Sequence, residues 1–252
     1  MGTDKHLIRK RFEASFSRYH RLALVQRDIC AELGKIAAGL CVRGNVSRAM
    51  EIGVGTGFLT SHLVRLFPDA EWYLNDISSL SLDFLRDNMP SHSTFLYGDA
   101  ENMEFPRHLD LIASASTVQW FYDMPGFALK AAGATNRGGW LVMSTFGTDN
   151  FREIRETTGE GLHYHSFSEL CGIFKTAGYE IVSGVEYTRT LRFDTPVDVL
   201  RHIKATGVNS LVRTHWGPRQ LAAFDDKYRK THSVEGGVTL TYNPILIAAR
   251  KR

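Results

Sequence analysis

The spacing of apolar residues along the chain changes between a helical period and a strand-like one. Residues 4 to about 40 place Phe12, Phe16 and Tyr19 at helical spacing, which predicts helix over this segment. The stretch GNVS (44–47) ends that pattern, and short apolar runs then alternate with stretches of helical spacing. Strands that alternate with helices of about 10–15 residues indicate βαβ units and a parallel sheet.

The same pattern predicts the bounds of the elements. Strands are expected at 48–54, 71–76, 94–99, 109–116 and 138–146, and helices at 58–67, 80–89, 124–134 and 167–178. Two longer strand-like segments, 179–193 and 236–251, follow. Because an insertion of about residues 194–235 separates them, we expect an antiparallel hairpin that closes one edge of the sheet.

Length and composition are those of an ordinary globular protein. With 252 residues, of which 43% are hydrophobic and 23% charged, the chain fits one α/β domain with additions. A net charge of +3 does not by itself indicate nucleic acid. Cys30, Cys41 and Cys171 are far apart, so we expect neither a disulfide framework nor a metal site. No apolar run approaches the roughly 18 residues of a membrane span, and we expect a cytoplasmic protein.

A glycine-rich turn follows the first expected strand. Gly53, Gly55 and Gly57 lie between that strand and a helix, where parallel sheets bind ligands. A dinucleotide fingerprint would need a third glycine at Phe58, and no lysine follows as in a phosphate-binding loop. Glu51 would repel a pyrophosphate but suits a ligand with a sulfonium and an amino-acid head. The simpler alternative is a tight turn between strand and helix.

This turn resembles the first motif of the class I S-adenosylmethionine-dependent methyltransferases. That resemblance implies an α/β fold with a Rossmann-like, seven-stranded, mostly parallel sheet. Asp76 then ends the second strand as an acceptor for the ribose hydroxyls, and Asp99 ends the third as an acceptor for the adenine amino group. The cofactor contacts implied are Gln26, Glu51, Gly53, Gly55, Gly57, Asp76, Ile77, Asp99, Ala100 and Ser116.

The segment SASTVQWFYD (114–123) follows the fourth strand, which usually lies nearest the transferred methyl group. It contains neither the Asn/Asp-Pro-Pro-aromatic motif of DNA amino-methylating enzymes nor a Pro-Cys nucleophile, and no basic stripe with interleaved aromatics indicates nucleic acid. It is similar to the small-molecule branch that includes the trans-aconitate methyltransferases. A closer resemblance, to the malonyl-acyl carrier protein O-methyltransferase family of biotin synthesis, is carried by residues 12–26, 50–60, 98–101, 116–123, 144–154, 195–211 and 239–251.

The resemblance implies methylation of the free carboxylate of a malonyl thioester, on acyl carrier protein or coenzyme A. Tyr19, Gln119 and Arg201 are the candidate catalytic residues, with ordinary core or surface positions on helices as the alternative. Arg201 is favoured as the carboxylate anchor, because a guanidinium fork matches a carboxylate. The candidate substrate and lid residues are Trp120, Phe146, Asn150, His202 and Lys204, although Asn150 could simply cap a helix.

The domain prediction is a single methyltransferase domain over 1–252, with amino-terminal helices (1–43), a cofactor-binding core (44–193), a lid (194–235) and a final strand (236–252). Between Thr188 and Arg219 there are 6 Lys or Arg and 2 Asp residues. Such a basic stretch could steer the docking of an acidic acyl carrier protein. It could equally bind RNA or have no partner. The alternatives to a malonyl thioester enzyme are a methyltransferase of a free small acid and a non-catalytic S-adenosylmethionine-binding module. A monomer is favoured.

Overall fold

The computed structural model describes residues 5–40, 46–86, 89–206 and 216–252, which divide into two compact units. The core unit consists of Leu24–Thr145, Ser166–Val185 and Ile245–Arg252. The second unit consists of the described residues of Met1–Ala23, Phe146–His165 and Glu186–Pro244. The second unit therefore contains more than the insertion 194–235, because it also includes the amino-terminal helix and residues 146–165.

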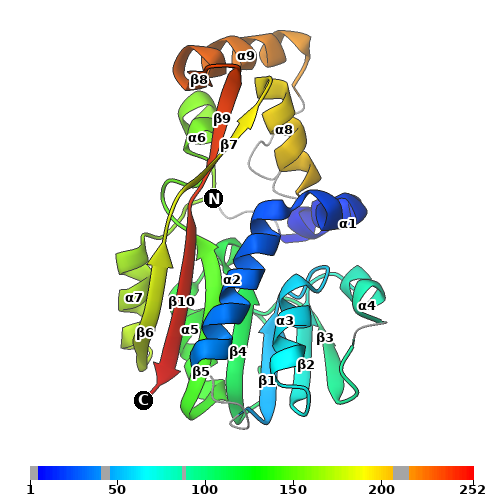
Figure 1. Cartoon of the computed structure of the whole chain (residues 1–252), viewed down its shortest axis with the longest axis vertical. Helices are drawn as coiled ribbons and strands as arrows, with labels where there is room; N and C mark the ends of the chain where they lie inside the picture. The colour runs from blue at the N-terminus through cyan, green and yellow to red at the C-terminus, as the bar shows by residue number, and fades with distance from the viewer. Residues whose placement is uncertain (1–4, 41–45, 87–88, 207–215) are drawn as a thin grey trace. The chain divides into compact units, whose positions relative to one another are not determined.

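The core unit is built on a seven-stranded sheet with the strands β1 (Arg48–Ile52), β2 (Glu71–Asp76), β3 (Ser93–Tyr97), β4 (Leu109–Ala115), β5 (Thr135–Phe146), β6 (Tyr179–Glu186) and β10 (Pro244–Lys251). Their order is β3-β2-β1-β4-β5-β10-β6 (Figure 1), and the pairs from β3 to β5 are parallel. The Arg252 amide donates to the Gly178 carbonyl at 3.1 Å, and the Tyr187 amide to the Pro244 carbonyl at 3.2 Å. These two bonds make β6 and β10 antiparallel, so the predicted closing hairpin and mostly parallel sheet are confirmed.

The helices of the core unit are α2 (Leu24–Leu40), α3 (Phe58–Leu66), α4 (Leu80–Leu85), α5 (Met124–Ala134) and α7 (Phe167–Thr176), with a short 3₁₀ turn, η2 (Val118–Trp120). Local capping sets the start of two of them. The Asp123 side chain accepts from the Gly126 amide at 2.8 Å before α5, and Ser166 and Glu169 form a capping box at α7. Both helices consequently begin where the sequence predicts.

The second unit contains α1 (Lys5–Leu22), α6 (Arg152–Thr158), α8 (Pro196–Ala205), α9 (Pro218–His232), β7 (Arg189–Phe193), β8 (Ser233–Val234) and β9 (Gly237–Tyr242). Strand β9 pairs antiparallel with β7 on one side and β8 on the other. Helix α1 packs against α8, α8 packs against α9, and α6 packs against both α9 and β9. The helical segment predicted over residues 4–40 is thus two helices, α1 and α2, which meet at Ala23.

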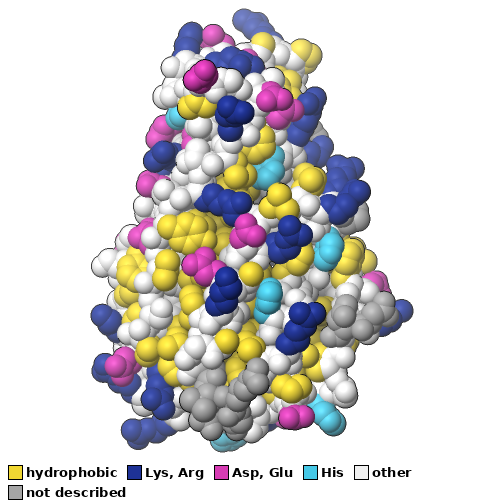
Figure 2. All heavy atoms as spheres, in the orientation of Figure 1, with side chains coloured by type: hydrophobic (Ala, Val, Ile, Leu, Met, Phe, Trp, Pro, Cys, Tyr) yellow, Lys and Arg dark blue, Asp and Glu magenta, His cyan; other side chains and the backbone are white. Residues whose placement is uncertain are grey.

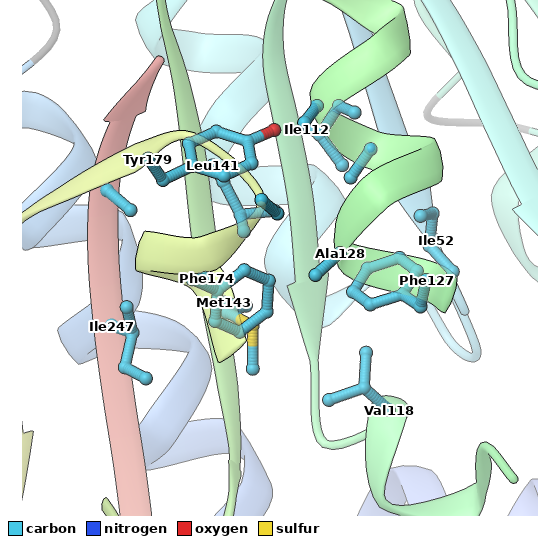
Figure 3. Close-up of a cluster of buried hydrophobic side chains, with 14 of the residues drawn as sticks. Ile52, Ile112, Val118, Phe127, Ala128, Leu141, Met143, Phe174, Tyr179 and Ile247 are labelled. Carbon is cyan, nitrogen blue, oxygen red and sulfur yellow. The ribbon is translucent and has the colours of Figure 1, made fainter. Parts of the chain in front are cut away.

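Apolar side chains of helices and strands meet in a buried cluster within the core unit (Figure 3). Phe127 of α5 is 2% exposed, and its ring lies 5.1 Å from that of Phe121 and 6.4 Å from those of Phe105 and Phe174. Such aromatic pairs add to the free energy gained by burying their area. The core therefore fixes α5 and α7 on the sheet.

No helix in the described part of the chain combines the length and the apolar character that crossing a bilayer requires.

Phe127→Ala should lower the free energy of unfolding by about 3–5 kcal/mol, because it leaves a cavity among three other rings. Leu129→Ala is the matched control on the same helix, since Leu129 is 61% exposed, and it should change stability by no more than about 0.5 kcal/mol. Urea denaturation followed by circular dichroism measures both variants. Equal losses for the two would contradict this account of the core.

Candidate active site

The carboxyl ends of the parallel strands bring four loops to one edge of the sheet. Strand β1 lies between β2 and β4, and its last residue, Ile52, is in register with Asn75 and Ser114. The loops after these three strands are therefore neighbours, and the loop after β3 follows the strand that pairs with β2. Ligands of open parallel sheets bind outside this edge.

The loop after β1 is a turn that requires glycine. Gly53, Gly55 and Gly57 have φ angles of +71°, +53° and +82°, in the left-handed region that other residues enter at a cost of about 1–2 kcal/mol. A Cβ atom on Gly53 would lie 2.1 Å from Oγ1 of Thr117. The Gly53 amide donates to the carbonyl oxygen of Asn75 at 2.9 Å. The turn is thereby fixed against the end of β2 on one side and the loop after β4 on the other.

Asp76, the last residue of β2, completes this arrangement. It is 5% exposed, and its Oδ2 and Oδ1 accept the amides of Gly55 and Ser78, both at 2.8 Å. Burial raises the pKa of Asp76, and these hydrogen bonds oppose the rise. Each carboxylate oxygen has a second lone pair. Asp76 can therefore hold the preceding turn and still accept hydrogen bonds from a ligand, as its predicted role as the ribose acceptor requires.

Glu51 lies buried within β1, with only 1% of its surface exposed. Burial raises the pKa of Glu51 to about 8, Thr60 opposes the rise, and the negative charge of Asp76 adds to it. Among the residues described, none is a hydrogen-bond partner of its Oε2 atom. Near neutral pH most of the Glu51 side chains are therefore protonated unless a cation lies beside them.

The loop after β3 is held by a lysine that the sequence did not single out. Oδ1 of Asp99 accepts the Glu101 amide at 3.0 Å, and Oδ2 accepts Nδ2 of Asn102 at 2.8 Å. Nζ of Lys130, on α5, donates to the carbonyl oxygens of Ala100 at 3.1 Å and Glu101 at 2.5 Å. Lys130 follows Ala100 by 30 residues, and no motif spacing signals such a contact.

The loop after β4 contains a residue in a strained conformation. Ser116 has a φ angle of +51°, which costs a residue other than glycine about 1–3 kcal/mol. Its amide donates to the carbonyl oxygen of Ser144 at 3.1 Å, and Nε2 of Gln119 donates to its carbonyl oxygen at 2.6 Å. The carboxylate of Glu101 accepts the Tyr122 amide at 2.8 Å, so the loops after β3 and β4 are joined.

Several buried side-chain oxygens of the core unit have no hydrogen-bond partner in the described part of the chain. They include Oε1 of Gln26, Oε2 of Glu51, Oγ1 of Thr56, Oγ of Ser116 and Oε1 of Gln119. An unpaired buried polar atom costs about 1–3 kcal/mol. Four of these residues belong to the loops and strand ends described above. Gln26 lies in the first turn of α2, a helix whose start Figure 1 draws at the same edge of the sheet. This edge therefore suits a polar ligand that supplies hydrogen-bond donors. Two further predicted residues, Ile77 and Trp120, are half-buried and follow Asp76 and Gln119 in the chain.

Asn150 has a structural place in the second unit. It is 2% exposed, its Nδ2 donates to the hydroxyl of Tyr164 at 2.9 Å, and its Oδ1 accepts the Asn243 amide at 3.1 Å. Glu153, which the sequence did not single out, accepts the amide and the hydroxyl of Thr241 at 2.9 and 2.6 Å. Together they fasten the segment that contains α6 to the end of β9.

Phe146 and His202 belong to an aromatic cluster around Tyr242 in the same unit. Nε2 of His202 lies 2.8 Å from the Tyr242 hydroxyl, and burial lowers the pKa of His202. The ring of Phe146, which is 6% exposed, lies 6.1 Å from that of Tyr242. These contacts pack the second unit internally.

Tyr19, Arg201 and Lys204 lie on helices of the second unit. The Tyr19 ring is half-buried, 5.1 Å from that of Phe12. The Arg201 side chain is 74% exposed and pairs with Asp198 at 2.8 Å, a kind of contact that contributes at most about 1 kcal/mol. Lys204 is exposed. Both basic residues are therefore accessible to a partner.

The described ranges contain no group of three or more side chains that could hold a metal ion. Cys30 and Cys171 are free thiols. Cys41, Arg213 of the basic stretch, and residues 207–211 of the segment 195–211 lie outside the described residues.

Comparison with known proteins places the chain among methyltransferases. A family described as "Methyltransferase domain" matches residues 50–143. The chain is 36% identical to the malonyl-[acyl-carrier protein] O-methyltransferase of Acinetobacter baylyi, over 100% of this chain and 98% of that protein. It is 38% identical to the protein of the same name from Prosthecochloris aestuarii, over 98% of this chain and 94% of that one.

Solved structures share the fold at low sequence identity. The YcgJ protein of Bacillus subtilis has a TM-score of 0.63 and 17% identity, over 87% of this chain and 97% of that one. An N-methyltransferase of Haemonchus contortus, solved with phosphomonomethylethanolamine and S-adenosylhomocysteine, has a TM-score of 0.56 and 16% identity, over 88% and 52% of the two chains. The predicted class I methyltransferase fold is confirmed.

Glu51→Gln should stabilise the protein without ligand more at pH 9 than at pH 6. Between the ordinary pKa of 4.5 and the folded value of about 8, the folded state keeps a proton that the unfolded chain has released. The free energy of unfolding of the wild type therefore falls as the pH rises through this window. At 1.36 kcal/mol for each pH unit, the advantage of Gln should grow by about 1–3 kcal/mol between pH 6 and pH 9.

Urea denaturation of both proteins at the two pH values measures this difference. Glu104→Gln, at an exposed carboxylate of the same unit, is the control for the loss of one negative charge. An advantage of Glu51→Gln that is the same at both pH values would show that Glu51 does not titrate in this window.

Proposed function

The chain belongs to the malonyl-[acyl-carrier protein] O-methyltransferase family, and from this premise we propose that it methylates the free carboxylate of malonyl-acyl carrier protein. The methyl donor is S-adenosylmethionine, and the product is the malonyl methyl ester. The observation that carries the proposal is the similarity to proteins of that name over the whole chain. In the pathway that we propose, the ester enters pimeloyl and biotin synthesis, because its masked charge allows chain elongation.

The loops at the edge of the core sheet support S-adenosylmethionine as the donor. The cofactor offers an ammonium group, ribose hydroxyls and an adenine amino group, all of which donate hydrogen bonds. We assign Gln26 and Glu51 to the amino-acid end, Asp76 to the ribose and Asp99 to the adenine. The other assigned contacts are Gly53, Gly55, Gly57, Ile77, Ala100 and Ser116. The unpaired oxygens of Gln26, Glu51 and Ser116 fit these assignments.

The chemistry places modest demands on the protein. A carboxylic acid with a pKa of roughly 4 is ionised at neutral pH, so no general base is needed. S-adenosylmethionine, when bound, supplies an electrophilic methyl group. The side chains of the protein then bind the carboxylate, orient it and exclude water, and such positioning can lower a barrier by up to about 7–11 kcal/mol.

We also assign residues to the malonyl group, which accepts the methyl group. Gln119, beside the strained Ser116, and Tyr19 are assigned to the orientation of the malonyl group, and Arg201 to its carboxylate. Arg201 would exchange Asp198 for the substrate, at little cost for an exposed pair. The remaining residues that we assign to the acceptor are Trp120, Phe146, His202 and Lys204. Asn150 has an indirect role, because it holds in place the segment that contains α6.

Incubation with methyl-labelled S-adenosylmethionine should label malonyl-acyl carrier protein as a base-labile ester. Malonyl-coenzyme A, free malonate and free aconitate are the comparison substrates. Glu51→Gln should reduce labelling about tenfold or more, through a higher KM for the donor, because a hydrogen bond to a charged group is worth about 1.5–3 kcal/mol. Label on free acids alone would identify an enzyme of small acids, and no label would indicate a binding module.

Binding of S-adenosylmethionine should release a proton near pH 7. A cationic ligand beside Glu51 stabilises its ionised form, so binding lowers the pKa of Glu51 from about 8 and the affinity should rise between pH 6 and pH 8. Titration calorimetry in phosphate and in Tris measures the released proton as a difference between the two enthalpies. The wild type should show this difference and Glu51→Gln should not. Equal enthalpies for the wild type would contradict the assignment of Glu51.

A further inference from the structure

Helix α1 is the most basic element of the second unit. Its 18 residues contain six Lys or Arg and one acidic residue, Glu13, a formal charge of +5. The stability of the helix accounts for only part of this composition. Arg21 lies in the last turn, where a cation stabilises a helix, but the first turn contains Lys5 and no acidic residue, which is the unfavourable arrangement. The charge of α1 therefore calls for another explanation.

The exposed cations of α1 share one face. Lys10, Ala14, Arg18 and Arg21 are all exposed, and at 3.6 residues per turn they fall within an arc of about 80°. The one acidic residue of the helix, Glu13, lies off this face and pairs with Arg9 at 3.9 Å. The basic face, defined here as Lys10, Ala14, Arg18 and Arg21, thus has no carboxylate of α1 within it.

The apolar side of α1 is already used within the second unit. Ile8 and Phe16, in the body of the helix, are 7% and 3% exposed, and among its described large apolar side chains only Leu7 and Leu22, near its two ends, are exposed, at 38% and 47%. Helix α1 packs against α8, which adds the exposed cations Arg201 and Lys204. A membrane-surface helix would need its apolar side free for lipid. Figure 2 shows Lys and Arg side chains along the side of the molecule on which Figure 1 draws α8 and α1.

We propose that the basic face of α1, extended by Lys204, is the docking surface for the carrier domain of the thioester substrate. This inference rests on the proposed function. Acyl carrier proteins are acidic, and a helix-length row of cations complements an acidic surface at the distance over which charges steer association. The row lies on α1 and not only in the insertion, where the exposed Arg201 is partly neutralised by Asp198.

RNA is the competing partner for a basic surface. A site for single-stranded RNA combines cations with exposed aromatic rings on which bases stack. The basic face of α1 carries Ala14 between its cations and no aromatic residue. The observations therefore favour a folded acidic protein.

The test is the triple variant Lys10→Glu/Arg18→Glu/Arg21→Glu. We expect its kcat/KM for malonyl-acyl carrier protein to fall about tenfold or more at about 50 mM salt, and the loss to shrink at about 0.5 M salt as the charges are screened. Its kcat/KM for malonyl-pantetheine, which has the same thioester without a carrier domain, should stay within about twofold of the wild type.

Arg65→Glu/Arg107→Glu/Arg137→Glu is the matched control, since it makes the same change in net charge at exposed positions of the core unit. Equal losses in the two triple variants would reduce the effect to net charge. An equal loss with malonyl-pantetheine would assign α1 to folding or chemistry. Unchanged kinetics, with loss of binding to a labelled RNA oligomer, would make RNA the partner. Failure of the proposed function would instead appear as a wild type that methylates neither thioester.

Discussion

The left-handed turn after β1 is the constraint on which the ligand edge of the core unit depends. Three positive φ angles within five residues keep the backbone of Gly53 so close to Thr117 that no Cβ atom fits between them. Asp76 accepts the amide of Gly55, so the turn, the end of β2 and the loop after β4 hold one another in place. The edge is consequently preorganised, and a ligand finds its acceptors already positioned, which limits the entropy lost on binding.

This preorganisation has a cost in stability that a bound ligand would relieve. Glu51 is buried beside the charge of Asp76, Ser116 is held in a strained conformation, and oxygens such as Oε1 of Gln26 lack partners in the described residues. Proteins tolerate unfavourable features of this kind mainly at functional sites. The same atoms that weaken the unliganded fold are those to which we assign the donor, and stability and binding are therefore linked at this edge.

Features that depend on neighbouring residues in the chain can be predicted from the sequence, whereas contacts between distant residues cannot. Strand β2 and helix α5 have the predicted bounds 71–76 and 124–134, because a short apolar run and the Asp123 cap are encoded by adjacent residues. The glycines, Asp76 and Asp99 can be identified as candidate site residues from the sequence. They follow or end the expected strands, and a parallel sheet brings the ends of its strands together. Lys130 and Glu153 were missed, since their partners lie 30 and 88 residues away and their helices look ordinary in the sequence. The full extent of the second unit likewise depends on contacts between segments that are distant in the chain.

Charge has two different physical roles in the two units. The side chains of Glu51 and Asp76 are buried, so they act over hydrogen-bonding distance, are little affected by salt and suit the small cationic ligand to which we assign them. Lys10, Arg18 and Arg21 stand in water, where a single pair contributes little affinity but a row of like charges raises the rate at which an oppositely charged protein arrives. The reaction that we propose joins a small cationic donor to an acceptor group on a large acidic carrier, and it requires both kinds of recognition. We therefore assign the glycine turn to the donor and helix α1 to the carrier of the acceptor.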